Sequence, residues 1–151
     1  MSTTIVRLTP ERFDSFVALI GALAAYERLD PPDAAAVERL RNDAFGPRPR
    51  FEAFLACADD GRAVGYAIVF ETYSSFLAKP TMYLEDIFVL ESERRSGAGG
   101  MLFDAVVDLA RQRGCGRVDW QVLDWNMLAR EFYEKRGAAC EKDWLLYRIT
   151  L

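Results

Sequence analysis

The chain of 151 residues is long enough to bury a substantial core, and about half of its residues are hydrophobic. Its net charge of −4 argues against a general binder of nucleic acid or anionic membranes, and it suits a cationic substrate. Histidine is absent from the sequence, which excludes any mechanism that needs imidazole as a base or a metal ligand. Catalysis would therefore depend on Glu, Asp, Tyr, Lys or Cys side chains.

The cysteines and the N-terminus give further expectations. Cys57, Cys115 and Cys140 are scattered without a Cys-x-x-Cys spacing, so neither a disulfide framework nor a zinc site is expected. The N-terminus lacks the basic and apolar pattern of a signal peptide, and no apolar run approaches the ~20 residues that span a bilayer. We expect a cytoplasmic protein with no metal, no membrane partner and no nucleic-acid partner.

The first third of the chain predicts one strand and two helices. Residues 4–8 alternate as a strand, and residues 10–26 follow with apolar side chains at three- and four-residue steps, which is typical of a helix with one buried face. Thr9 and Pro10 mark the start of that helix. Asp33 is expected to cap a shorter helix through Leu40.

The rest of the chain alternates strands with helices. Two apolar runs over 51–58 and 63–73 flank Asp59-Asp60-Gly61 and predict an antiparallel hairpin. A loop over 74–80 follows, and then a strand over 82–90 and a long glycine-flanked helix over 97–113. The last predicted elements are a strand over 118–123, a helix over 126–135 and a final strand over 144–151. This order favours a single domain over 1–151 of the α/β or α+β class, with one mixed sheet covered by helices on both faces.

The connection between the strand over 82–90 and the following helix is rich in arginine and glycine. It contains Arg94-Arg-Ser-Gly-Ala-Gly99, and unpaired N–H groups at a helix N-terminus attract a phosphate or pyrophosphate. Leu102 stands where a dinucleotide-binding fingerprint needs its third glycine, and no Gly-Lys-Ser/Thr follows. The pattern predicts a phosphate-bearing cofactor, and the alternative is a tight connection without a ligand.

Three further segments extend this motif into a resemblance that covers nearly the whole chain. They are Tyr83–Val89, Asp124–Ala138, and an N-terminal stretch with Tyr26-Glu27 and Phe45-Gly46. Together with the glycine turn they resemble the GCN5-related N-acetyltransferase (GNAT) family, in its diamine (spermidine/spermine) branch with the thialysine-acetylating relatives. The resemblance implies a single mixed, mostly antiparallel sheet, acetyl-CoA as co-substrate, a small diamine- or polyamine-like acceptor, direct transfer in a ternary complex and a homodimer.

The coenzyme residues are expected by the same resemblance. The backbone of residues 87–89 would pair with the pantetheine arm much as an added strand does, and the glycine turn would hold the pyrophosphate. Asn126 is expected both to cap its helix and to line the cofactor. The full expected set is Ile87, Phe88, Val89, Arg94, Arg95, Ser96, Gly97, Ala98, Gly99, Gly100, Asn126, Met127, Leu128 and Ala129.

Two residues are expected to be catalytic. Glu85 is the candidate base, directly or through water, and it is expected to be buried in its apolar strand, while period-two alternation places Asp86 on the opposite face. Tyr133 is the candidate acid, because a phenol that ionises near pH ~10 is protonated at neutral pH and can donate to the leaving thiolate. The alternatives are a structural carboxylate at Glu85 and a half-buried aromatic residue at Tyr133.

The acceptor amine is the part of the function that the sequence leaves most open. The resemblance implies contacts from Tyr26, Glu27, Glu85, Asp119, Trp120 and Gln121. Ser74 replaces an acidic residue of that branch, and the stretch from Ala139 to Trp144 is short, which weakens the polyamine assignment. Thialysine or another amino-acid side chain is therefore an alternative acceptor, and a protein amine is a weaker one. An acetyl-cysteine intermediate is a weaker alternative for the mechanism, and a non-catalytic acyl-CoA sensor is a weaker alternative for the function.

Overall fold

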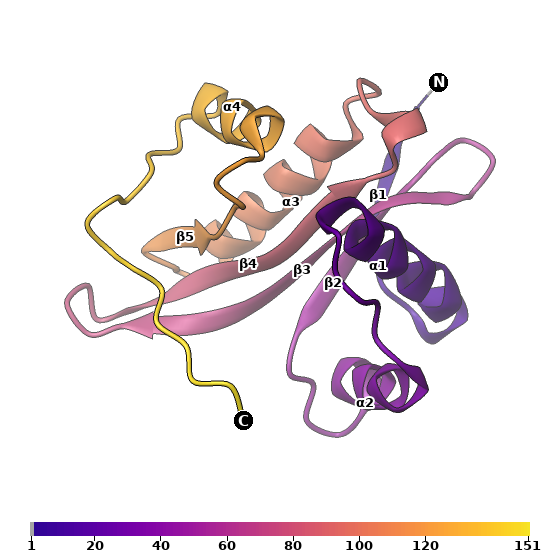
Figure 1. The fold of residues 1–151 in the computed structure, drawn as a ribbon, viewed down its shortest axis with the longest axis horizontal. Helices are drawn as coiled ribbons and strands as arrows, with labels where there is room; N and C mark the ends of the chain where they lie inside the picture. The colour runs from indigo at the N-terminus through magenta and orange to yellow at the C-terminus, as the bar shows by residue number, and fades with distance from the viewer. Residues whose placement is uncertain (1) are drawn as a thin grey trace. The chain divides into compact units, whose positions relative to one another are not determined.

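A computed structural model describes residues 2–151, which form two compact units, one ending at Trp120 and the other running from Gln121 to Leu151. The first unit contains a five-stranded sheet in the order β1-β2-β3-β4-β5 (Figure 1). Neighbouring strands are antiparallel except for β4 and β5, which are parallel. The strands are β1 (Thr4–Arg7), β2 (Glu52–Cys57), β3 (Ala63–Ser74), β4 (Lys79–Val89) and β5 (Arg117–Trp120).

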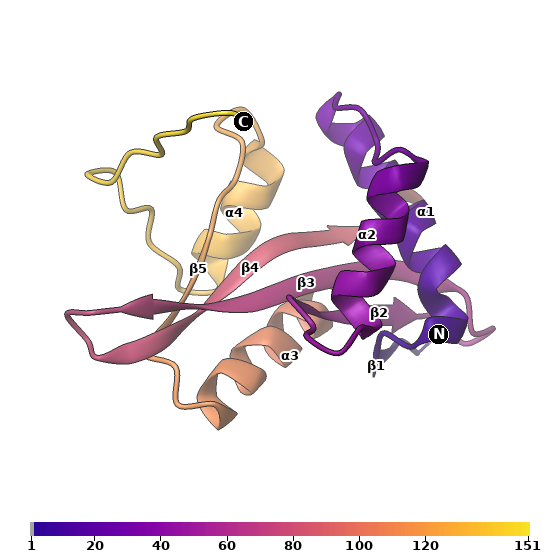
Figure 2. The same cartoon turned by 90° about the horizontal axis from the view of Figure 1, so that it is seen from below.

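Helices cover both faces of this sheet. Figure 2 shows α1 (Phe13–Glu27) and α2 (Ala34–Phe45) on one face and α3 (Ala98–Gln112) on the other. Two short 3-10 turns, η1 (Pro10–Arg12) and η2 (Glu91–Glu93), precede α1 and α3. The core on the α1 side is formed by buried side chains from α1, β2, β3 and β4, among them Phe13, Phe16, Leu19, Leu55, Tyr66, Ile68 and Phe88. The predicted fold class, a mixed and mostly antiparallel sheet between helices, is confirmed.

The first predicted helix begins as the 3-10 turn over Pro10–Arg12, so α1 starts at Phe13, and Thr9 makes no capping side-chain hydrogen bond. Asp33 caps α2 as predicted, because its Oδ1 accepts a hydrogen bond from the Ala36 N–H at 2.8 Å. The helix then continues to Phe45 instead of ending at Leu40. Residues 41–45 contain no glycine or proline, so the first helix-breaking residues are Gly46 and Pro47.

Strand β4 contains a β-bulge that period-two alternation does not anticipate. Val69 of β3 lies opposite Leu84, whereas the adjacent Ile68 lies opposite Asp86, so Glu85 is an extra residue without a partner position. A bulge of this kind re-aims the side chains of the strand that carries it. The alternation of faces along β4 is therefore broken at Glu85.

One edge of β4 is only partly paired. Strand β5 pairs with β4 over Thr81–Leu84 and ends there at Trp120, earlier than the predicted Leu123. Beyond Leu84, the part of β4 from Glu85 to Val89 has no strand partner on that side within residues 2–151. Backbone N–H and C=O groups of an unpaired strand edge are available to an extended ligand.

The second unit contains α4 (Met127–Lys135), which is capped as predicted. The Asn126 Oδ1 accepts a hydrogen bond from the Ala129 N–H at 3.2 Å, and Gly137 follows the helix with φ of +89°. The predicted strand over 144–151 is wrong, because these residues form neither helix nor strand and their side chains are exposed. Apolar and aromatic residues favour a strand only where a neighbouring strand can pair with them.

Within residues 2–151, none of the helices has the length and apolar character that crossing a membrane requires.

Candidate functional site

The turn before α3 contains left-handed backbone at two positions. Arg95 and Gly97 have φ of +72° and +86°, and a Cβ placed on Gly97 would meet nothing within 4 Å. The Ala98 N–H donates to the Ser96 Oγ at 3.3 Å, and Gly97 caps α3 without a side-chain hydrogen bond. Gly97 is exposed, so the turn leaves open space beside the N-terminus of α3, which suits an anionic group at the positive end of the helix dipole.

Arg94 is held in place beside this turn. Its guanidinium lies 4.8 Å from the ring centroid of Tyr26 and 5.7 Å from that of Phe88, and its Nε donates to the Val89 carbonyl at 3.2 Å. These contacts fix the side chain beside the two rings. They also bring expected coenzyme residues of β4 and the turn next to Tyr26, an expected substrate residue at the end of α1.

A pocket of about 450 Å³ lies on the α1 and α2 face of the sheet. Most of its walls are apolar, and its lining residues are Ile20, Pro32, Ala36, Leu40, Arg50, Phe51, Ile68, Phe70, Glu85 and Asp86. The charged side chains are confined to β4 and to the segment just before β2. A mostly apolar pocket with a few charged groups is the usual form of a small-molecule site.

The two carboxylates of β4 line this same pocket, which corrects two expectations. Asp86 was expected on the opposite face from Glu85, and the bulge at Glu85 places both on the pocket side. Glu85 was expected to be buried, and its side chain is exposed. Asp86 is the more enclosed of the two, and the hydroxyl of Tyr66 donates to its Oδ2 at 3.0 Å.

Burial raises the pKa of Asp86 to about 6, and repulsion from the charges of Glu85 and Glu27 raises it further. The hydrogen bond from Tyr66 acts in the opposite direction and lowers this pKa. Burial and the nearby Asp86 also raise the pKa of Tyr66, so its hydroxyl stays protonated and donates. Glu27, at the end of α1, has a raised pKa because it is partly buried. Glu85 and Asp86 line one end of the pocket, and Glu27 is near enough for its charge to act on Asp86, so a cationic amine there would lower the mutual repulsion of these acids.

Other expected substrate residues have different surroundings. Asp119 forms an ion pair with Arg117 at 3.5 Å, and the Trp120 ring packs edge-on against Phe103 of α3 with centroids 5.4 Å apart. Neither residue lines the pocket. Ser74 is buried, and its Oγ accepts a hydrogen bond from the Leu77 N–H at 3.2 Å, so it closes the β3–β4 turn.

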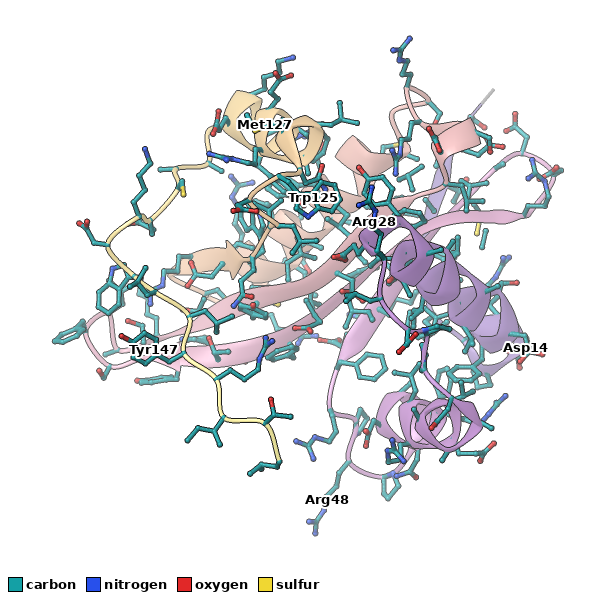
Figure 3. The ribbon with its side chains drawn as sticks, viewed as in Figure 1. Asp14, Arg28, Arg48, Trp125, Met127 and Tyr147 are labelled. Carbon is teal, nitrogen blue, oxygen red and sulfur yellow. The ribbon has the colours of Figure 1, made fainter. Side chains whose placement is uncertain are left out.

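The remaining expected residues belong to the second unit. Tyr133 is buried on α4, and its ring packs edge-on against Phe132 with centroids 5.4 Å apart. Met127 and Leu128 are exposed in the first turn of α4. Figure 3 labels Met127 on this helix and Trp125 just before it. Gln121 is exposed at the start of this unit. Asn126 and Ala129 form the helix cap described above.

None of the cysteines lines the pocket. Cys57 is buried in the core on the α1 side, where its Sγ accepts a hydrogen bond from the Arg12 guanidinium at 3.3 Å. Burial raises the pKa of the Cys115 thiol, which lowers the fraction of reactive thiolate. Within residues 2–151, no three His, Cys, Asp or Glu side chains are grouped to hold a metal ion.

Comparison with known proteins defines the class. The family model described as "Acetyltransferase (GNAT) family" matches residues 17–138. The chain belongs to this family, and its characterised relatives place it among the N-acetyltransferase enzymes. Enzymes of the family use acetyl-CoA.

Two relatives are named for their acceptors. L-ornithine N5-acetyltransferase NATA1 of Arabidopsis thaliana is 47% identical over 92 residues, which cover 61% of this chain and 40% of the plant protein. The chain thus spans less than half of that relative. Thialysine N-epsilon-acetyltransferase of Bos taurus is 33% identical over 131 residues, which cover 82% of this chain and 76% of the bovine protein.

A solved structure confirms the fold. AAC(6')-Iy in complex with the bisubstrate analog CoA-S-monomethyl-acetylneamine superposes with a TM-score of 0.81 at 22% identity, and all of both chains is covered. At this identity the likeness concerns the fold alone.

Proposed function

We propose that this protein transfers the acetyl group of acetyl-CoA to a primary amine of a small molecule, by direct transfer within a ternary complex. The observation that carries the proposal is the pocket on the α1 and α2 face, in which the bulge of β4 presents the carboxylates of Glu85 and Asp86 together. Because the family match spans both units, we treat the whole chain as one functional domain.

The coenzyme site is proposed on the turn before α3 and the open edge of β4. The residues present fit a pyrophosphate and an extended amide-bearing arm, because Gly97 leaves open space at the helix N-terminus and residues 85–89 lack a strand partner on one side. Bound acetyl-CoA would supply an activated acetyl thioester. Arg95, Ser96 and the glycines would hold its diphosphate, Arg94 would add charge from its stacked position, and Asn126–Ala129 of the second unit would line it.

The acceptor must lose a proton before it can attack. An alkylamine with a pKa near ~10.4 is neutral only about once in 10³ molecules at pH 7. We assign Glu85 as the base, directly or through one water molecule, and Asp86 as the group that holds the arriving ammonium. Asp86 can also share the proton, because its raised pKa of about 6 lies closer to neutral pH than that of an ordinary carboxylate.

Tyr133 is the proposed acid. It would donate its phenolic proton to the coenzyme thiolate. An ordinary phenol, with a pKa near ~10, is protonated at neutral pH, and transfer to a thiolate whose conjugate acid has a pKa near ~8.5 is uphill by only about 2 kcal/mol. Direct attack by the amine is favoured over an acetyl-cysteine intermediate because none of the cysteines lines the pocket.

The acceptor class is a small diamine- or polyamine-like amine, with ornithine, thialysine or a similar amino-acid side chain as the second candidate. The acidic end of the pocket supports both, and the named relatives support the second. The homodimer and the cytoplasmic location implied by the resemblance stay predictions.

The test is a mass-spectrometric assay with acetyl-CoA and a panel of polyamines, diamines, ornithine, lysine and thialysine. We expect an N-acetylated product from at least one primary amine and no stable acetyl-enzyme in the intact-protein spectrum. Tight coenzyme binding without any product would indicate a non-catalytic acyl-CoA sensor and would overturn the proposal.

A further inference from the structure

The acceptor pocket has opposite charges at two of its sides. Glu85 and Asp86 line it from β4, and Arg50, which lies two residues before β2, lines it from the other side. Strand β3 runs between β2 and β4 and contributes Ile68 and Phe70 to the pocket. The walls between the charges are apolar, with Ile20, Pro32, Ala36, Leu40 and Phe51 as the other members.

The geometry of the sheet sets the separation of the backbones that carry these charges. Neighbouring strands lie about 4.8 Å apart, so β2 and β4 are about 10 Å apart across β3. Asp86 lies opposite Ile68 and Ile68 lies opposite Ala53, so Arg50, three residues before Ala53, is displaced by a further ~10 Å along the strand direction, which puts the two backbones roughly 14 Å apart. The Arg50 backbone is tied down by its N–H, which donates to the Asp43 carbonyl at 2.8 Å. A ligand that reaches both sides must therefore carry two charged groups separated by an apolar chain.

Arg50 is available to such a ligand. Its side chain is exposed, and no carboxylate of residues 2–151 lies within ion-pair distance of its guanidinium. By contrast, Arg62, Arg113 and Arg117 on the same unit each have a carboxylate partner. The Arg50 guanidinium is a fork of donors whose geometry matches a carboxylate.

This charge discriminates between the two acceptor classes. The distal ammonium of a diamine or polyamine would approach a guanidinium, where like charges repel, whereas the carboxylate of an amino acid would pair with it. In lysine six bonds separate the side-chain nitrogen from the carboxylate carbon, and the extended chain measures roughly 7 Å at standard bond lengths. With a hydrogen bond of about 2.9 Å at each end, the ligand spans roughly 13 Å between its two partners, which is of the same order as the separation of the two backbones.

We infer that the acceptor is an amino acid with a terminal side-chain amine, and that Arg50 is its specificity-determining residue. The amine lies at Glu85 and Asp86, the methylene or thioether chain lies along the apolar walls, and the carboxylate pairs with Arg50. The α-ammonium stays in solvent at the exposed end. This inference rests on the proposed function and selects its second acceptor class over the first.

The test compares amino acids with the diamines that lack only the carboxylate. Steady-state kcat/KM is measured for L-lysine against cadaverine and for L-ornithine against putrescine, with wild type, Arg50→Gln, Arg50→Glu and Arg48→Gln. Arg48 is the matched control, because it lies in the same loop, does not line the pocket, and extends outward in Figure 3. Binding of the four ligands to the protein with CoA present is measured by calorimetry.

Wild type is expected to prefer each amino acid to its diamine. Arg50→Gln should lower kcat/KM for the amino acids by about 10- to 100-fold, as expected for a lost hydrogen-bonded ion pair. It should leave kcat/KM for the diamines unchanged or raise it, because the like charge that repels their distal ammonium is gone. Arg50→Glu should reverse the preference, and Arg48→Gln should change neither.

A wild-type preference for diamines in both turnover and binding, or equal losses for both ligand classes in Arg50→Gln, would overturn the inference while leaving the acetyltransferase proposal intact. Failure to acetylate any amine would instead overturn the proposed function. The calorimetric comparison would still decide whether Arg50 selects a carboxylate.

Discussion

The turn before α3 and the acceptor pocket are built in different ways. The turn consists of consecutive residues, and its working groups are backbone N–H groups arranged by left-handed conformations at Arg95 and Gly97. The pocket is assembled from two helices, the segments before α2 and β2, and strands β3 and β4, and its working groups are side chains. A backbone site tolerates many side chains and suits a coenzyme that is common to a family, whereas a side-chain pocket can change its acceptor without changing the fold.

The largest expected effect is a loss of kcat when the proposed base of the pocket, Glu85, is replaced. Glu85→Gln removes the proposed base but keeps the size of the side chain and the bulge, so kcat should fall by about 10²- to 10³-fold, within the range that general-base catalysis supplies. The dissociation constant for acetyl-CoA should stay unchanged, because the turn is a separate structure. Steady-state kinetics and calorimetry measure the two quantities.

Glu91→Gln in η2 is the control for this change, since Glu91 is exposed and outside the pocket. Near-wild-type kcat in Glu85→Gln would show that another group accepts the proton.

The second effect concerns stability at Asp86. Its folded-state pKa of about 6 exceeds the ordinary value of about 3.9, so the folded protein binds more protons than the unfolded chain in the interval between them. This carboxylate therefore lowers the free energy of unfolding as the pH rises from about 4 to above 6. Asp86→Asn should remove that loss and make the protein more stable at pH 7.5 by up to about 3 kcal/mol, at about 1.36 kcal/mol per pKa unit.

Urea unfolding between pH 4 and pH 8 measures this difference, which should shrink toward zero at pH 4. A variant that is less stable than wild type at neutral pH would mean that the charged form of Asp86 stabilises the fold. The kcat/KM of Asp86→Asn should still fall, because the ammonium of the acceptor loses a charged partner.

The third effect separates backbone strain from coenzyme binding. Gly97 and Gly114 flank α3, both have positive φ (+86° and +70°), and at both a Cβ atom would meet only open space. Alanine at either position should lower the free energy of unfolding by about 1 kcal/mol, the cost of a left-handed conformation. Only Gly97→Ala should also raise the KM for acetyl-CoA, by about tenfold. Equal KM values in the two variants would remove the turn from the coenzyme site.

The smallest effect is expected at the β3–β4 turn. Ser74→Ala removes the buried hydroxyl that accepts the Leu77 N–H and should lower the free energy of unfolding by about 1 kcal/mol. The kinetic constants for small amines should not change. Ser75→Ala, at the adjacent exposed position, is the stability control. A specific loss of amine affinity in Ser74→Ala would instead place this residue in the substrate site.

The contrast between local and assembled features also explains what could be predicted from the sequence. Helix caps at Asp33 and Asn126, the hairpin at Gly61 and the glycine turn depend on short stretches, and all of them formed as expected. The pairing of Glu85 with Asp86 depends on one extra residue in the β3–β4 register, which no local pattern in the sequence reveals.

Arg50 was missed for a similar reason. It follows an irregular, proline-containing stretch, and only the folded sheet brings it to the same pocket as residues 85 and 86. The final strand over 144–151 failed because its apolar residues fit a strand only when an edge is present to pair with them.

The most direct test of the central claim is a crystal structure of the protein with CoA and an N-acetylated amine product. We predict that the acetylated nitrogen lies within hydrogen-bond distance of the Glu85 or Asp86 carboxylate, in the pocket on the α1 and α2 face. A product bound outside that pocket, with both carboxylates far from its nitrogen, would contradict this claim.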